Sequence, residues 1–514
     1  AEVETAISSY DDNRLFSALK ASITFDSGDR ESAISILEDV VEGTEPGTEA
    51  NRYKVTLAKM LVAEGNEVGA RQFIEDVLAN DPNQVAALKM SARWKIDSDQ
   101  PEEALRALRL ALDRSPNDAE AMTLMAEAHE RNGSRELALD VLALAVEASG
   151  EAPRESLLLA QRMLDQKRYR PAEDILVRAL RRTPRHVGLL TMLGRVYMAD
   201  EDWPRADQVQ QTLAKIGTPQ ATAQANEIQL QILGRRDGRA DAVAFLENLT
   251  TSETGNSAAT VALIRARIAE GRIDEALAIA EELASSAPDD PRAKLVLGNT
   301  QFAAGRYSDA EVTLRESLAE DTNAATALQL VRVLGAQSRP DDARNALDDA
   351  IAALPNNAQL LVAKAGILER ENDIDGAIAI YQSLYEEDTS SLVIANNLAS
   401  MLATYRDDDA SLERATHVAR RLRGTTIPPL QDTYGWILFR NGQFDEALTY
   451  LEPAALGLSD DPIVQFHLAK TYLALGREDD ARAAFQRASD IASDNDPRGQ
   501  IAEAREFLQA ISNQ

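Results

Sequence analysis

Four histidines are the residues of this sequence that could bind a transition metal. They are His129, His186, His417 and His467. A catalytic or structural zinc site needs several such ligands at close spacing, as in His-Glu-x-x-His, and no two of these histidines show it. We therefore interpret them as surface or packing residues and expect no metal site.

Paired carboxylates could exchange protons as a general acid and base. The clearest clusters are Asp341-Asp342 and Glu478-Asp479-Asp480. Each stands where a helix is expected to begin, and carboxylates there favour the positive end of the helix. The sequence also has no phosphate-binding glycine motif and no Gly-x-Ser-x-Gly serine elbow. We expect no catalytic residue, no enzyme activity and no cofactor.

Composition narrows the possible partners. The 514 residues contain 84 acidic and 54 basic side chains, a net charge of −30, and no cysteine. Such a surface repels nucleic acid, so we expect no nucleic-acid partner. Disulfides and thiolate sites are excluded, and no apolar run is long enough for a transmembrane segment.

Small residues recur with a period near 34 along most of the chain. In the stretch from Asp432 to Ala454, an alanine stands five residues after the glycine of an Asn-Gly turn, and the same alanine returns in other stretches. These alanines are Ala33, Ala70, Ala104, Ala138, Ala172, Ala206, Ala242, Ala276, Ala310, Ala343, Ala377, Ala415, Ala447 and Ala481. The period predicts a repeat protein.

Glycine and proline mark the turns of each repeat. Glycine precedes many of the alanines by five residues, and a proline follows five of them by twelve, as Pro82 follows Ala70. Proline cannot continue a helix, so each unit is predicted to be helix, glycine turn, helix, proline turn.

The repeat resembles the tetratricopeptide repeat, with Leu193-Gly194-Arg195-Val196-Tyr197 leading to Ala206 as one of its clearest copies. This resemblance implies an all-α solenoid, a right-handed superhelix of about fourteen helix-turn-helix units. In each unit the first helix (helix A) would approach the second (helix B) closely at a Gly or Ala such as Gly194, opposite the recurring alanine of helix B.

Four segments are expected. They are an N-terminal array over 1–214, an irregular repeat or hinge over 215–257, a C-terminal array over 258–496 with an exposed insertion near 403–432, and a capping helix over 497–514.

In tetratricopeptide repeats, helix A lines the concave groove, and the residue after the Gly or Ala slot faces it. Six of the twelve residues at this position are basic here, namely Lys59, Arg93, Arg195, Arg265, Arg332 and Lys470, while Glu127 interrupts the row. One hypothesis is a basic ladder that binds an acidic peptide or an anionic polymer through arginine forks. The alternative is that these side chains pair with glutamates of neighbouring helices.

Trp436 occupies the same position, beside Phe439 and Tyr434. We expect Tyr434 to be a core residue and treat Trp436 as a candidate exposed anchor for a partner.

The sequence favours a non-catalytic scaffold of a multiprotein assembly that binds an extended or acidic segment of one or more protein partners in its concave groove. The alternatives are an envelope protein that handles an anionic polysaccharide and the regulatory arm of an enzyme. The stretches Asn396–Ala403, Asp432–Leu448 and Phe466–Ala488 resemble bacterial lipoproteins of the PEP-CTERM/exosortase type and the repeat scaffolds of alginate and cellulose export.

This second resemblance implies a periplasmic or outer-membrane-associated location in a Gram-negative bacterium, with the cytoplasm as the alternative. The first residues, Ala-Glu-Val-Glu, fit a mature end left by signal-peptide cleavage, and equally a shortened chain. The lipid-bearing cysteine of such lipoproteins has no counterpart, since the sequence has no cysteine.

Overall fold

The computed structural model describes residues 14–250, 257–494, 496 and 498–512. These residues form helices and turns without a strand, as the sequence predicts. The first helices are α2 (Arg14–Asp26), α3 (Arg30–Glu42), α4 (Thr48–Ala63), α5 (Glu67–Asn80), α6 (Val85–Asp97), α7 (Pro101–Arg114), α8 (Ala119–Arg131), α9 (Arg135–Ala148), α10 (Pro153–Asp165), α11 (Tyr169–Arg182), α12 (Val187–Ala199), α13 (Trp203–Ile216), α14 (Pro219–Ile232) and α15 (Arg239–Thr250).

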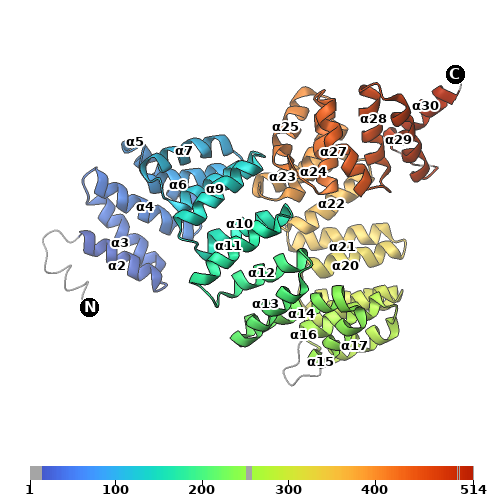
Figure 1. Cartoon of the computed structure of the whole chain (residues 1–514), viewed down its shortest axis with the longest axis horizontal. Coiled ribbons are helices and arrows are strands. Elements are labelled where there is room, and N and C mark those ends of the chain that lie inside the picture. The colour runs from blue at the N-terminus through green and yellow to red at the C-terminus, as the bar shows by residue number, and fades with distance from the viewer. Residues whose placement is uncertain (1–13, 251–256, 495, 497, 513–514) are drawn as a thin grey trace. The chain divides into compact units, whose positions relative to one another are not determined.

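The later helices are α16 (Ser257–Ala269), α17 (Ile273–Ser286), α18 (Pro291–Ala303), α19 (Tyr307–Glu320), α20 (Ala324–Ala336), α21 (Pro340–Ala353), α22 (Ala358–Arg370), α23 (Ile374–Glu387), α24 (Leu392–Tyr405), α25 (Asp409–Ala419), α26 (Pro428–Arg440), α27 (Phe444–Gly457), α28 (Pro462–Ala474), α29 (Glu478–Ile491) and α30 (Gly499–Ser512). From α2 to α29 they form consecutive pairs of a helix A and a helix B, and α30 packs on the last pair (Figure 1). None of the described helices is long and apolar enough to cross a membrane.

The chain divides into two compact units. Unit 1 contains residues 1–159 together with 419–434, and unit 2 contains residues 160–418 together with 435–514. The predicted boundaries near 214 and 258 are not those of the two units, and whether 215–257 acts as a hinge stays a prediction. That segment is irregular, since a π-helical turn, η1 (Leu233–Asp237), separates α14 from α15, while residues 251–256 lie outside the described part.

Most turns within a pair contain one residue in the left-handed region of backbone space, whereas the turn between α24 and α25 contains none. Glycine fills it in several turns, as at Gly133, with a φ of 72°, and Gly271, with a φ of 74°. Elsewhere a residue with a side chain takes the place, as at Asp99, with a φ of 57°. The prolines also stand as predicted, since Pro82 lies in the turn that follows α5.

The recurring alanines of helix B are buried, which confirms the predicted packing; Ala242, in the irregular pair, is half-buried. At Gly298, the residue of helix B that contacts the small Gly or Ala position of helix A is a leucine, and not the recurring alanine that the sequence predicts. A Cβ on Gly298 would lie 2.7 Å from Cδ2 of Leu314, one turn after the alanine of that helix B. A large residue in this slot would therefore collide with a buried leucine.

The predicted insertion near 403–432 contains both exposed and buried residues. It forms α25 and a short 3₁₀ helix, η2 (Arg420–Leu422), and Arg421 and Leu422 are buried. We call Arg420–Gly424 the 420–424 segment. It belongs to unit 1, where it lies against the turns after α6 and α8.

One buried carboxylate holds the 420–424 segment. Nη2 of Arg420 donates to the carbonyl oxygen of Asp99 at 3.0 Å and to its Oδ1 at 2.7 Å, and Arg421 donates to the same Oδ1. Asp99 is 6% exposed and Arg421 is 3% exposed. Arg135 donates to the carbonyl oxygen of Gly424 at 3.4 Å. Removing one partner from such a buried set leaves an uncompensated charge, which costs about 3–5 kcal/mol.

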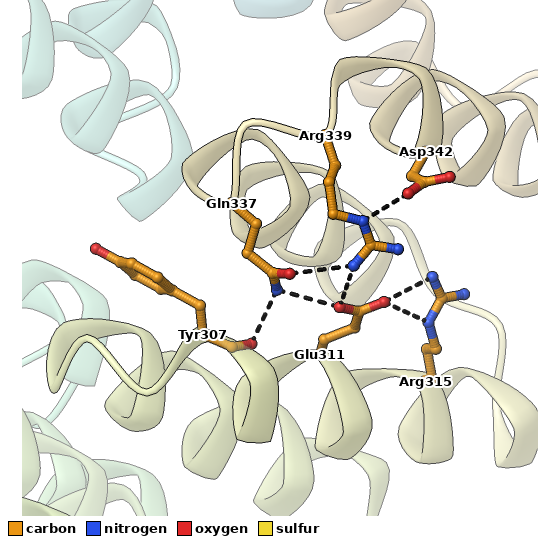
Figure 2. A network of polar contacts seen from close by, with 6 residues as sticks. All are labelled: Tyr307, Glu311, Arg315, Gln337, Arg339 and Asp342. Carbon is orange, nitrogen blue, oxygen red and sulfur yellow. Dashed lines mark hydrogen bonds and ion pairs between the residues drawn. The ribbon is translucent and has the colours of Figure 1, made fainter.

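Ion pairs also join successive B helices in unit 2. Glu311 of α19 accepts hydrogen bonds from Arg315 on its own helix, and from Gln337 and Arg339, which precede α21 (Figure 2). Nε of Arg339 also donates to Asp342 at 2.6 Å, within the first turn of α21. Burial raises the pKa of Glu311, but the hydrogen bonds from Arg315, Gln337 and Arg339 outweigh it and hold the pKa below its ordinary value of 4.5.

The contact between an arginine before helix B and a carboxylate of the preceding helix B recurs in other pairs of unit 2. Arg306, just before α19, lies 3.6 Å from Glu281 of α17, and Arg477, just before α29, lies 3.7 Å from Glu452 of α27. The hydroxyl of Tyr472 donates to the same Glu452 at 2.8 Å. An arginine before helix B thus contacts a carboxylate of the preceding helix B.

The close packing at the Gly or Ala position of helix A predicts that two glycine substitutions differ in their effect on stability. A Cβ on Gly335, in α20, would meet no heavy atom within 4 Å. Gly335→Ala should stabilise the protein by about 1 kcal/mol through helix propensity. Gly298→Ala gains the same propensity but crowds Leu314, and overpacking costs about 1–3 kcal/mol. Urea unfolding should show Gly298→Ala to be less stable than Gly335→Ala by that amount; equal stability would contradict the packing account.

Docking of the 420–424 segment can be tested at Gly133. A Cβ there would lie 2.2 Å from the carbonyl oxygen of Arg420, whereas a Cβ on Gly271, at a similar φ, meets nothing within 4 Å. Gly133→Ala should displace the segment, and brief trypsin treatment should then cleave after Arg420, Arg421 or Arg423. Gly271→Ala carries the same backbone strain and is the control. Equal resistance of both variants to cleavage in 420–424 would argue against the docking.

Glu311 predicts a pH-dependent loss of stability. Because its folded pKa is lowered, its contribution is complete above its ordinary pKa of 4.5 and is lost as the pH falls through the folded pKa. Glu311→Gln should lower the free energy of unfolding by about 1–2 kcal/mol near pH 7 and by less near pH 3. The control is Glu316→Gln, at an exposed residue of the same helix. A pH-independent difference would be the contrary result.

Candidate functional site

The predicted ladder residues all lie on A helices. Lys59 and Arg93 belong to unit 1, and the other predicted residues belong to unit 2. Their helices are α4 for Lys59, α6 for Arg93, α12 for Arg195, α16 for Arg265, α20 for Arg332, α26 for Trp436 and α28 for Lys470. The structure brings Lys59 and Arg93 together at one hollow.

Two ladder residues form ion pairs with a neighbouring repeat. Nη1 of Arg93 lies 2.7 Å from Oε2 of Glu127, and Nζ of Lys470 lies 2.6 Å from Oε1 of Glu503. Glu127 occupies the ladder position of the next repeat, which explains why the row is interrupted there. For these two cations the alternative of pairing within the chain holds.

The four remaining cations, unlike Arg93 and Lys470, form no ion pair with a carboxylate of the described residues. Lys59, Arg195 and Arg265 are exposed and form no hydrogen bond or ion pair with any residue that the structure describes. Arg332 is exposed, its Nη1 lies 3.3 Å from Oε1 of Gln329, and its guanidinium lies 5.7 Å from the ring centroid of Phe302. These four side chains present positive charge to solvent.

Trp436 is not an exposed anchor, so that prediction is wrong. Its side chain is buried, with 9% of the residue exposed. Its ring stacks on Phe439, with centroids 4.7 Å apart, and on His467, with centroids 4.1 Å apart. Phe466 packs at 6.4 Å. Four aromatic rings from α26 and α28 therefore enclose one another. Tyr434 is buried, as predicted.

A hollow of about 260 Å³ lies across the A helices of unit 1, and we call it the unit 1 hollow. It is lined by side chains of α4, α6, α8 and the start of α10. These are Lys59, Val62, Ala86, Lys89, Met90, Arg93, Trp94, Glu120, Leu124 and Arg154. The lining combines apolar side chains with four cations and one carboxylate.

Lys89 is the most constrained cation of this lining. Its Nζ lies 2.8 Å from Asp118 and 2.6 Å from Glu120. Burial lowers the pKa of Lys89, but the hydrogen bonds to these two carboxylates outweigh it and raise the pKa. Asp118 also accepts from the backbone N–H of Ala121 at the start of α8. Lys89 therefore keeps its proton, and the carboxylates of Asp118 and Glu120 already balance its positive charge.

The sequence contains a signal for part of this lining. Lys89 precedes Arg93 by four residues, so both lie on the same face of α6. Met90 and Trp94 repeat that spacing beside them. Arg154 could not be found in this way, because it reaches the hollow from another repeat at the first turn of α10.

The described residues contain no group of three or more His, Cys, Asp or Glu side chains that could hold a metal ion. Asp341 and Asp342 lie in the first turn of α21, and Glu478, Asp479 and Asp480 in that of α29, as predicted. Their position indicates a role at helix ends. The A helices present exposed cations and, at the unit 1 hollow, apolar side chains.

Comparison with known proteins identifies the repeat. One tetratricopeptide-repeat model matches residues 239–299, 267–334 and 438–506, and a second matches residues 90–153 and 328–391.

A curated relative is the uncharacterized protein y4yS of Sinorhizobium fredii, 34% identical over 94 residues. The match covers 18% of this chain and 52% of that protein, so the chain spans about half the length of its relative.

Two solved structures are similar in their chain path. One is the crystal structure of the APC/C hetero-tetramer Cut9-Hcn1, with a TM-score of 0.39 and 14% identity over 99% of this chain and 97% of that chain. The other is the structure of Naa15/Naa10 bound to HypK-THB, with a TM-score of 0.36 and 12% identity over 90% and 96% of the two chains. At such TM-scores neither structure indicates a function.

Proposed function

We propose that this chain, which is built of tetratricopeptide repeats, is a scaffold that binds an acidic segment of a protein partner along its A helices. The observation that carries the proposal is the set of exposed cations at one helical position, Lys59, Arg195, Arg265 and Arg332, which no carboxylate of the described residues neutralises. Within each unit, stacked repeats expose neighbouring A helices, and this suits recognition of extended segments.

The charge of the chain makes these cations informative. With 84 acidic and 54 basic residues, most arginines can find a carboxylate within the molecule, as Arg93 finds Glu127. A guanidinium without such a partner can bind a carboxylate through two parallel hydrogen bonds. The location in a bacterial envelope stays a prediction from sequence resemblance.

The proposal predicts salt-dependent binding of an acidic polypeptide. Replacing Arg195, Arg265 and Arg332 with Ser should weaken binding of labelled poly-L-glutamate about tenfold at low salt, because each exposed charge pair contributes about 0.2–1 kcal/mol. Fluorescence anisotropy at low and high salt measures the loss. The control replaces three other exposed arginines of unit 2, Arg181, Arg185 and Arg292.

Equal binding by the wild type and the triple variant would contradict the proposal. Stronger binding of a polyuronate than of poly-L-glutamate would instead favour the alternative of an anionic polysaccharide.

A further inference from the structure

We propose that the unit 1 hollow is a docking pocket for one bulky apolar side chain of an acidic protein segment, with Lys59 and Arg154 binding a neighbouring carboxylate. This inference rests on the proposed function for the kind of partner. Its site is separate, because it uses only residues of unit 1.

The floor of the hollow is apolar and held in place. Trp94 and Leu124 are 8% and 4% exposed, and Met90, which also lines the hollow, is half-buried. The guanidinium of Arg71 lies 5.0 Å from the ring centroid of Trp94, which fixes the indole by a cation–π contact. A floor whose side chains are already ordered loses little conformational entropy when it binds a ligand.

The rim carries two cations that are less neutralised than Lys89 and Arg93. Lys89 and Arg93 are neutralised by their own carboxylates. Lys59 has no hydrogen bond or ion pair with a described residue. The side chain of Arg154 is 63% exposed, and its nearest carboxylate, that of Glu155, is 4.0 Å away. Lys59 and Arg154 therefore stand on two different helices, α4 and α10, at one hollow.

The size and chemistry of the hollow favour a side chain over a small molecule. Small-molecule pockets enclose about 300–1,000 Å³ and bury most of their ligand. The unit 1 hollow, at about 260 Å³, lies just below this range, a size that one large side chain can fill. The exposed apolar side chain of Val62 extends the lining at the end of α4. An apolar side chain on this floor and a carboxylate at the rim together describe a segment such as Leu or Phe beside Asp or Glu.

Charge complementarity excludes the opposite arrangement. Of the four cations that line the hollow, Lys89 and Arg93 are paired with carboxylates, so Lys59 and Arg154 supply the positive charge that a ligand would meet. A basic segment would meet this excess of positive charge at close range, and like charges there cost affinity. An acidic segment without an apolar side chain would leave the floor of Met90, Trp94 and Leu124 in contact with water.

The test begins from a displayed library of random peptides, selected on the purified full chain. We expect enrichment of peptides in which a bulky apolar residue stands beside Asp or Glu. Labelled copies of the selected peptides then give dissociation constants by fluorescence anisotropy. Met90→Glu should weaken binding at least tenfold, because it places a carboxylate on the apolar floor.

Two further variants separate charge from packing. The double charge reversal Lys59→Glu with Arg154→Glu alters only exposed side chains and should also weaken binding at least tenfold, with a loss that shrinks in high salt. Met122→Glu is the matched control, since Met122 is a half-buried methionine of α8 that does not line the hollow. Circular dichroism of each variant confirms that the helices are intact.

Selection of no peptide, selection of basic peptides, or unchanged binding by Met90→Glu and by the charge reversal would overturn the pocket. If those variants bind normally while the Arg195, Arg265 and Arg332 variant loses poly-L-glutamate, the pocket is wrong and the proposed function stands. If Met90→Glu abolishes binding of the selected peptides while the Arg195, Arg265 and Arg332 variant still binds poly-L-glutamate normally, the pocket stands. The role of those arginines then fails.

Discussion

The close approach of two helices within each repeat is the constraint on which the rest of the structure depends. Gly298 of helix A leaves no room for a Cβ because Leu314 of helix B fills the space. The face of helix A that carries the small residue is thereby turned toward helix B. The next residue lies about 100° further around the helix and faces away from that contact. Arg195, directly after Gly194, is exposed for this reason.

Polar contacts then add specificity to a packing pattern that every repeat shares. Glu311 and Glu452 each accept a hydrogen bond or form an ion pair with a residue of the following repeat. Polar contacts therefore join these repeats of unit 2 in addition to apolar packing. In unit 1, Asp99 has a different role, since its carboxylate binds two arginines of a segment more than three hundred residues away in the chain. An aspartate occupies a left-handed turn position there that glycine fills elsewhere. The turn of an ordinary repeat has become a binding site for another part of the same chain.

The cations of the A helices fall into two groups that differ in function. Arg93 is neutralised by a glutamate of the next repeat and Lys470 by a glutamate of α30, so both contribute to packing between neighbouring elements. Lys59, Arg195 and Arg265 have no such partner among the described residues and are available to a ligand. In unit 1 an apolar floor lies beside such a cation, and this combination gives the hollow a chemistry that the charged row alone does not have.

The sequence by itself determined the all-helical repeat, its register and the turn residues, because these depend on contacts within one unit. Gly298, Pro82 and the buried alanines such as Ala310 act over a few residues or within one helix pair, so their spacing reveals them. Only the tertiary structure decided which cations are free, since Arg93 and Arg195 look alike in sequence and differ by the presence of Glu127 across a repeat boundary. It also decided that Trp436 is buried and that Arg421 meets Asp99. Those contacts join residues of different repeats, and no local pattern encodes which of many similar side chains will meet.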